Sequence, residues 1–172
     1  TLLLSSPPYG AAQKYVRSTS LEAGWLGLAP RGRTIHIEHG SIGREHLSSE
    51  DAALTLADVR SSSLREALRA IEEKDPRRAA IYLTYFTDMQ KTFRNAQTQG
   101  VKRIALVTGT NNVVGGTLHT SRYLAEIVQS LGYQRTISLR DPIRGRTLLT
   151  NRRNGTPSPA EYIEVFEARS HA

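Results

Sequence analysis

The sequence predicts an α/β protein built on a mostly parallel sheet, with an antiparallel pair of strands at one edge. Short apolar runs at 2–4 and 104–107 are typical of strands that are buried on both faces. Strands that alternate with amphipathic helical stretches favour a parallel sheet. The last two expected strands have no helix between them, and this favours an antiparallel pair.

The first sixty residues predict one strand, one helical segment and a long irregular region. Residues 2–4 form the strand, and Pro7 and Pro8 cannot continue it. Residues 11–28 suggest a helical segment that ends near the glycines at 24 and 27. Residues 29–60 combine glycines, histidines and charges of both signs, so we expect a long loop, and long loops are usually functional.

Two helices are expected between 63 and 100. Ser63 and Glu66 match a capping box, and apolar residues then recur at helical spacing up to 71. The Asp-Pro pair at 75–76 ends this helix. A second apolar stripe runs from 82 to 96, and Gly100 is well placed to stop it. We interpret the stripe as part of the core.

The remaining third predicts a strand at 104–107, a glycine-rich loop at 109–116 and a helix around 124–131 that Gly132 ends. Strands are expected at 136–140 and 162–167, with a polar basic loop between them. The loop at 109–116 lacks the Gly-Lys-Ser/Thr ending of a phosphate-binding P-loop, so we expect it to follow a strand at the rim of a site.

Composition points to a single basic domain. The chain has 172 residues, 38% of them hydrophobic, and 23 Lys and Arg against 16 Asp and Glu give a net charge of +7. This balance favours a polyanionic partner, nucleic acid first, with a merely soluble basic protein as the alternative. The absence of cysteine excludes a disulfide, a thiolate nucleophile and a cysteine-type zinc site. No apolar stretch approaches about 18 residues and no signal peptide is evident, so we expect a cytoplasmic location.

The turn Ser6-Pro7-Pro8-Tyr9 carries the most chemical information. It lies at the carboxyl end of a buried strand, where open α/β sheets bind ligands. An exocyclic amino group on a base is a poor nucleophile because its lone pair is delocalised into the ring. A serine hydroxyl and a backbone carbonyl held by proline can accept its hydrogens, and an aromatic ring can stack on a base that has left the duplex. The alternative is a proline-rich surface turn.

This tetrapeptide resembles the catalytic turn of S-adenosylmethionine-dependent amino-methyltransferases that act on nucleic-acid bases. The resemblance to bacterial DNA methyltransferases extends over 9–28, 41–45, 103–116 and the closing stretch 161–167, and so covers essentially the whole chain. It implies a Rossmann-like methyltransferase sheet with a helical or loop insertion at about 29–75. It also implies S-adenosyl-L-methionine as cofactor and DNA as partner.

The resemblance assigns roles to the residues of the turn. Ser6, Pro7 and Tyr9 would hold and stack the base, and Pro8 would shape the turn. Ser6 and Pro7 would also border the cofactor. Serine at the first position favours the N4 amino group of cytosine over the N6 amino group of adenine. An RNA base as substrate remains an alternative.

The chain departs from the family in one respect. The glycine-rich turn and acidic residue that bind the cofactor precede this segment in the family, and they are not among these residues. We therefore expect residues 1–172 to be the C-terminal part of a catalytic domain, with the cofactor site supplied by a preceding segment or a partner chain. The alternative is a nucleic-acid-binding or regulatory subunit without catalysis.

Several basic side chains are candidates for contact with nucleic acid. The stretch 140–153 contains five arginines and only one acidic residue, which suits phosphate binding, although a solvated loop is the alternative. The histidines at 36, 39 and 46 match no standard zinc spacing. The expected nucleic-acid contacts are Lys14, Arg17, Arg44, Arg144, Arg146, Arg152 and Arg153.

Overall fold

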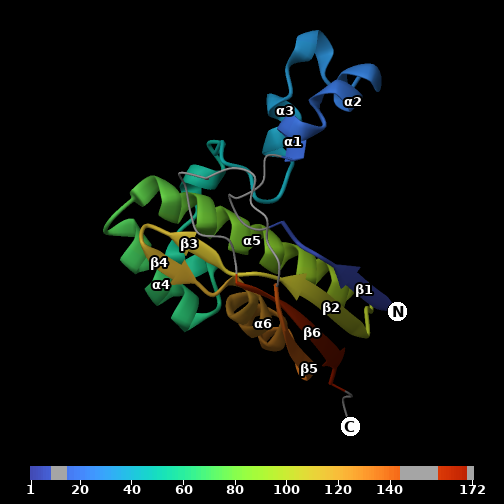
Figure 1. The fold of residues 1–172 in the computed structure, drawn as a ribbon, viewed down its shortest axis with the longest axis vertical. Helices are drawn as coiled ribbons and strands as arrows, with labels where there is room; N and C mark the ends of the chain where they lie inside the picture. The colour runs from blue at the N-terminus through green and yellow to red at the C-terminus, as the bar shows by residue number, and fades with distance from the viewer. Residues whose placement is uncertain (9–14, 144–158, 170–172) are drawn as a thin grey trace.

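A computed structural model of the chain describes residues 1–8, 15–143 and 159–169. Figure 1 shows a layer of strands with helices packed against it, and a group of short helices that lies apart. The strands are β1 (Leu2–Ser5), β2 (Arg103–Thr108), β3 (Asn111–Val113), β4 (Gly116–Leu118), β5 (Tyr133–Pro142) and β6 (Ala160–Ala168). The α-helices are α1 (Tyr15–Ser18), α2 (Ser20–Trp25), α3 (Ile35–His39), α4 (Ser62–Glu72), α5 (Pro76–Thr98) and α6 (Thr120–Ser130), and short 3₁₀ turns are η1 (Pro30–Gly32), η2 (Asp51–Ala53) and η3 (Leu56–Asp58).

The main sheet is mixed, so the expectation of a mostly parallel sheet is wrong. Its order is β1-β2-β6-β5, and only β1 and β2 run parallel. The edge pair of β5 and β6 is antiparallel, as expected. Because β6 also pairs antiparallel with β2, it separates β2 from β5 and leaves one parallel pairing. The protein is therefore α/β with a mixed sheet.

Local signals explain where α4 and α5 begin. The Asp75 carboxylate accepts a hydrogen bond from the backbone N–H of Arg78 at 2.9 Å, and Pro76 occupies the first turn. The helix α4 begins before the expected capping box. Its N-cap is Ser61, whose hydroxyl accepts from the N–H of Leu64 at 3.0 Å, so the prediction from Ser63 placed the cap too late.

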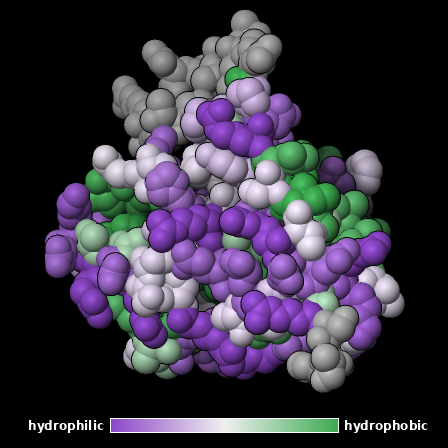
Figure 2. Space-filling view, turned by 90° about the horizontal axis from the view of Figure 1, so that it is seen from below, coloured by the Kyte–Doolittle hydropathy of each residue, from purple (hydrophilic) through white to green (hydrophobic). Residues whose placement is uncertain are grey.

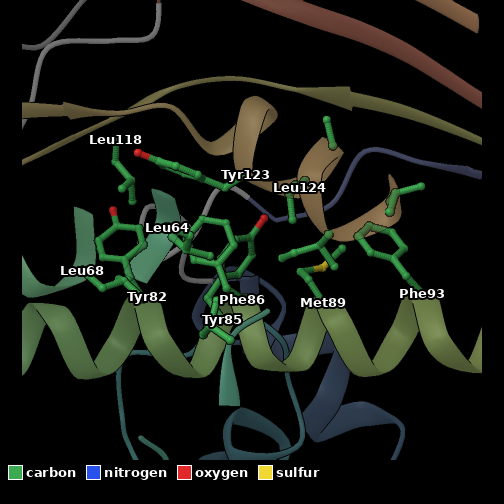
Figure 3. Packing of buried hydrophobic residues seen from close by; sticks show 14 of the residues in the cluster. Leu64, Leu68, Tyr82, Tyr85, Phe86, Met89, Phe93, Leu118, Tyr123 and Leu124 are labelled. Carbon is green, nitrogen blue, oxygen red and sulfur yellow. The ribbon is translucent and has the colours of Figure 1, made fainter. Parts of the chain in front are cut away.

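The core lies between the helices and one face of the sheet. In Figure 3 the side chains of Phe86, Met89 and Phe93 project from α5 toward α6 and the strands. Phe86 and Tyr123 of α6 meet edge to face, with ring centroids 5.9 Å apart. Residues of α4, α5, α6 and the sheet form one apolar cluster. It contains the stripe from Tyr82 to Phe93, as expected, whereas Ala96 at the end of the stripe is half-buried and lies outside the cluster.

The sheet residues that face this cluster alternate with residues that do not. Ile104, Leu106 and Phe166 are fully buried. The residues between them point to the opposite face of the sheet and are half-buried or exposed. Apolar side chains from all four strands lie on this opposite face. The largest exposed ones are Leu2, Leu4, Ile137 and Leu139. We define these four residues, together with Ala105, Val107, Ile163 and Val165, as the open sheet face.

One carboxyl group lies on the buried face of the sheet. Glu164 of β6 is 3% exposed, and one of its oxygens accepts a hydrogen bond from Arg135 of β5 at 2.9 Å. Burial raises the pKa of Glu164, and Arg135 offsets only part of this effect. The pair joins β6 to the edge strand β5.

Two segments that the sequence left irregular have regular structure. Residues 29–60 contain α3 and three 3₁₀ turns, because short helical hydrogen bonds satisfy the backbone there. The expected loop at 109–116 is mostly the hairpin of β3 and β4. Its turn holds Val114 and Gly115 at φ of +49° and +77°, the pattern of a tight hairpin turn.

The surface is largely polar. Seen from below, the face in Figure 2 is mainly hydrophilic, with hydrophobic side chains gathered in separate groups. Among the described residues, no helix combines the length and hydropathy needed to cross a membrane.

The two faces of the sheet predict different costs of truncating a leucine. Leu106→Ala removes a fully buried side chain, so we expect the free energy of unfolding of this chain to fall by about 2–5 kcal/mol. Leu4→Ala acts on the neighbouring strand, where the side chain is 69% exposed, and the loss should stay within about 0.5 kcal/mol. Urea unfolding of both variants measures the difference, and equal losses would contradict a core on one face.

Candidate functional site

The candidate site lies at the carboxyl ends of the parallel pair. Ser5 pairs with Leu106, so Ser6-Pro7-Pro8 and the residues after Thr108 leave the sheet at the same edge. Ser6 is exposed, Pro7 is buried and Pro8 is half-buried. The turn is thus anchored through its prolines while it presents a serine at the surface.

The segment 41–45 packs directly on this turn. Gly43 has a φ of +82°, and a Cβ built on it would lie 3.3 Å from Cβ of Pro8 and 4.0 Å from the ring of Tyr85. Glycine is required here for two reasons: the left-handed backbone disfavours a side chain, and the neighbouring proline leaves little room for one. Residues that are 35 positions apart in the chain therefore meet at the candidate site.

A buried ion-pair network fixes this segment. Arg44 binds Asp51 through two nitrogens, and its Nη1 donates to Asp88 of α5 at 2.5 Å and to the Ser41 carbonyl at 3.1 Å. The side chains of Arg44, Asp51 and Asp88 are 9%, 6% and 16% exposed. Two carboxylates that flank one guanidinium make this a structural connection between the insertion and α5.

The network alters the titration of its members. Burial alone would raise the pKa of Asp51, but hydrogen bonds from Arg44 and Ser48 outweigh it, so the pKa lies below the usual value of 3.8. Burial would lower the pKa of Arg44, and its bonds to Asp51 and Asp88 raise it instead. Both groups are thus held in their charged forms at neutral pH.

The loop after β2 is held by polar contacts at its base. The hydroxyl of Thr120 donates to the amide oxygen of Asn111 at 2.8 Å, and both residues are buried. Tyr82 of α5 also bonds Asn111, while burial raises the pKa of Tyr82 to about 12 and keeps its phenol neutral. These contacts connect the rim of the site to the N-terminus of α6 and to α5.

A polar cleft lies away from the predicted catalytic turn. It has a volume of about 540 Å³ and lies between the insertion and α5, beside Arg44, Asp51 and Asp88. Its described lining is mainly polar and does not include the Ser6 turn. Arg44, Asp51 and Asp88 in this lining are bound to one another, so these three charges serve the ion-pair network.

The sequence-predicted residues fall into three groups. Ser6, Pro7 and Pro8 lie together at the sheet edge, and Arg17 is exposed on α1. Arg44 lies in the interior with its donors engaged, so its geometry fits a structural role better than contact with nucleic acid. The other predicted residues lie outside the described part of the chain: Tyr9, Lys14, Arg144, Arg146, Arg152 and Arg153.

Sequence reasoning missed the structural roles of Gly43, Asp51, Asp88 and Asn111. Asp88 lies on α5 between core positions, where a polar residue ordinarily faces water. No short spacing relates Arg44 to Asp88, which is 44 positions away. The glycine next to Arg44 indicates a turn, but nothing in the local pattern names the partners of that turn. Within the described residues, no group of three or more potential ligands could hold a metal ion.

Comparison with known proteins gave no match: no protein-family model fits the chain, and no curated protein or solved structure is significantly similar to it.

Replacing the central cation should destabilise the protein. Arg44→Met leaves Asp51 and Asp88 buried without a countercharge, so we expect the free energy of unfolding to fall by about 3 kcal/mol or more. Urea unfolding at neutral pH measures the loss, with the exposed α5 variant Arg94→Met as the matched control. Adding Asp51→Asn and Asp88→Asn should recover part of it, and equal stabilities of Arg44→Met and Arg94→Met would contradict the network.

Acid should weaken the same network. Because the pKa of Asp51 is lowered in the folded state, its contribution to stability is present above pH 3.8 and is lost as pH falls through the lower folded value. Below pH 3.8, the stability of Asp51→Asn should therefore change less with pH than that of the unmodified protein. Urea midpoints across this range test the difference, and Asp141→Asn, at an exposed position on β5, is the control.

Proposed function

We propose that this chain carries the base-binding part of an S-adenosylmethionine-dependent DNA amino-methyltransferase, with the N4 amino group of cytosine as the favoured acceptor. The observation that carries the proposal is the position of Ser6-Pro7-Pro8, which leaves a parallel strand at the sheet edge where α/β proteins bind ligands. The α/β fold with its mixed sheet supports a Rossmann-like architecture.

The exposure of the turn agrees with this chemistry. Ser6 is exposed and can accept a hydrogen bond from an exocyclic amino group, while buried Pro7 holds the backbone in place. Hydrogen bonds accepted from the amino hydrogens localise the nitrogen lone pair and make it a better nucleophile. S-adenosyl-L-methionine would supply an electrophilic methyl group: the N–C bond forms as the C–S bond breaks, the neutral thioether leaves, and the proton lost from the nitrogen passes to solvent.

The residues present fit the acceptor half of such a site better than the cofactor half. Ser6 and Pro7 would border the cofactor, but the chain has no glycine-rich turn followed by an acidic residue to hold it. The open sheet face supports a further layer, since its four largest exposed side chains are aliphatic and an exposed apolar patch marks an interaction surface. We propose that a further segment or a partner chain packs there and brings the cofactor site.

DNA is the favoured partner because of charge. The net charge of +7 suits a polyanion, and Arg17 is exposed on the helix that follows the turn. An RNA base would be held by the same groups, and nucleic-acid binding without catalysis is the second candidate, favoured by the absent cofactor turn. The reaction on DNA would take place in the cytoplasm.

Transfer of labelled methyl groups to DNA tests the proposal. The assay uses this chain together with the polypeptide that supplies the cofactor site, and nucleoside analysis separates methylated cytosine from methylated adenine. Ser6→Ala should lower the rate about 100-fold or more, because one preorganised hydrogen-bonding group at the reacting atom is removed.

Ser62→Ala, at an exposed position on α4, is the matched control and should leave the rate unchanged. DNA binding with no methyl transfer under any of these conditions would favour the non-catalytic candidate. Transfer that proceeds equally in both serine variants would contradict the assigned role of the turn.

A further inference from the structure

The helices α1, α2 and α3 form an arm, residues 15–40, that lies apart from the sheet (Figure 1). Its large apolar side chains face solvent instead of a core. Trp25 is 83% exposed and Leu21, four positions earlier on α2, is 63% exposed, so both lie on the same side of the helix. Leu26, Leu28 and Ile35 are also exposed, and none of these residues belongs to the core cluster.

The segment that follows the arm packs on the candidate site. The chain enters it soon after the Ser6-Pro7-Pro8 turn and returns at Gly43, whose Cβ position is 3.3 Å from Pro8. The buried network of Arg44 then ties the returning segment to α5. A ligand held by the arm is therefore connected to the turn through the segment at Gly43.

The charge of the arm is positive. Arg17, Arg31 and Arg33 are exposed, and no ion pair within the described part of the chain uses them. The arm has two acidic residues, Glu22 and Glu38, against these three arginines, and Glu38 lies 3.6 Å from His46 outside the arm. Arg31 has a φ of +55° between Pro30 and Gly32, a backbone conformation that is rare for a residue with a side chain. The turn thus holds the backbone of Arg31 in a strained conformation while its side chain is exposed.

These features together indicate the kind of partner. An exposed apolar surface alone would suit another protein, and arginines alone would suit any anion. An exposed indole beside exposed arginines fits a nucleic-acid strand, whose bases stack on aromatic rings and whose phosphates bind cations. An enzyme that acts on a base must also unpair it, which leaves unstacked bases near its site.

We propose that residues 15–40 bind nucleic acid, with Trp25 stacked on an unpaired base and Arg17, Arg31 and Arg33 in contact with phosphates. This inference rests on the proposed function for the identity of the partner. It adds the surface that holds the strand beside the modified base.

Trp25 is the single tryptophan of the chain, so its fluorescence reports on the arm directly. Titration of the full chain with a mixed-sequence single-stranded DNA oligonucleotide should quench the emission in a saturable way. A duplex with one mismatched pair should quench it more than a fully paired duplex, because stacking needs an unpaired base. Binding of the oligonucleotide, seen by its anisotropy, with unchanged tryptophan emission would overturn the proposal.

Affinity measurements with variants give a second readout. Trp25→Ala should weaken binding of the single strand about tenfold or more, and Trp25→Phe should restore most of it. Gln129→Ala, at an exposed position on α6 outside the arm, should have no effect. Arg31→Ala with Arg33→Ala should also reduce the slope of log affinity against log salt by about 0.7 for each phosphate that is no longer neutralised, whereas Arg94→Ala should not.

The outcomes separate this inference from the proposed function. If Trp25→Ala leaves DNA binding unchanged while Ser6→Ala abolishes methyl transfer, the arm proposal fails and the function stands. If the arm binds DNA as described but methyl transfer does not depend on Ser6, the function fails and the arm stands. A dimer that Trp25→Ala dissociates, with no quenching by DNA, would identify a second copy of the chain as the partner and overturn the proposal.

Discussion

The burial of one long side of α5 is the constraint on which the rest of the structure depends. This helix packs against α6 and one face of the sheet through Phe86, Met89 and Phe93. The same helix carries Asp88, which binds Arg44 of the insertion. Because a rigid helix fixes all its side chains relative to one another, packing of the core also sets where the insertion attaches.

The attachment determines the shape of the candidate site. Arg44 is buried among Asp51, Asp88 and the Ser41 carbonyl, and its neighbour Gly43 lies against Pro8. A buried cation is tolerated only where carboxylates compensate for its lost hydration. The network therefore holds the segment at Gly43 and Arg44 in one position against the turn.

Large apolar side chains are exposed to solvent in two places on this chain. The open sheet face carries leucines and isoleucine at its two edges, and the arm carries Trp25 and Leu21. The two differ in charge. Exposed arginines without an ion pair among the described residues accompany the aromatic residue on the arm. On the sheet face aliphatic side chains run across the strands, and the charge of Arg103 there is paired with Glu167. The first combination suits a nucleic-acid strand and the second suits a layer of protein, because aliphatic surface is best covered by helices.

Much of the local structure was predictable from the sequence alone. Apolar periodicity indicated α5 and α6, the short run at 104–107 indicated β2, and the prolines after β1 fixed a turn at the end of a strand. These features are predictable because their physical cause lies within a few neighbouring residues. Tertiary structure decided the insertion of β6 between β2 and β5, the inward orientation of Arg44 and the contact of Gly43 with Pro8. Each of these depends on pairing or charge compensation between segments far apart in the chain, and no local pattern specifies which distant group will be the partner.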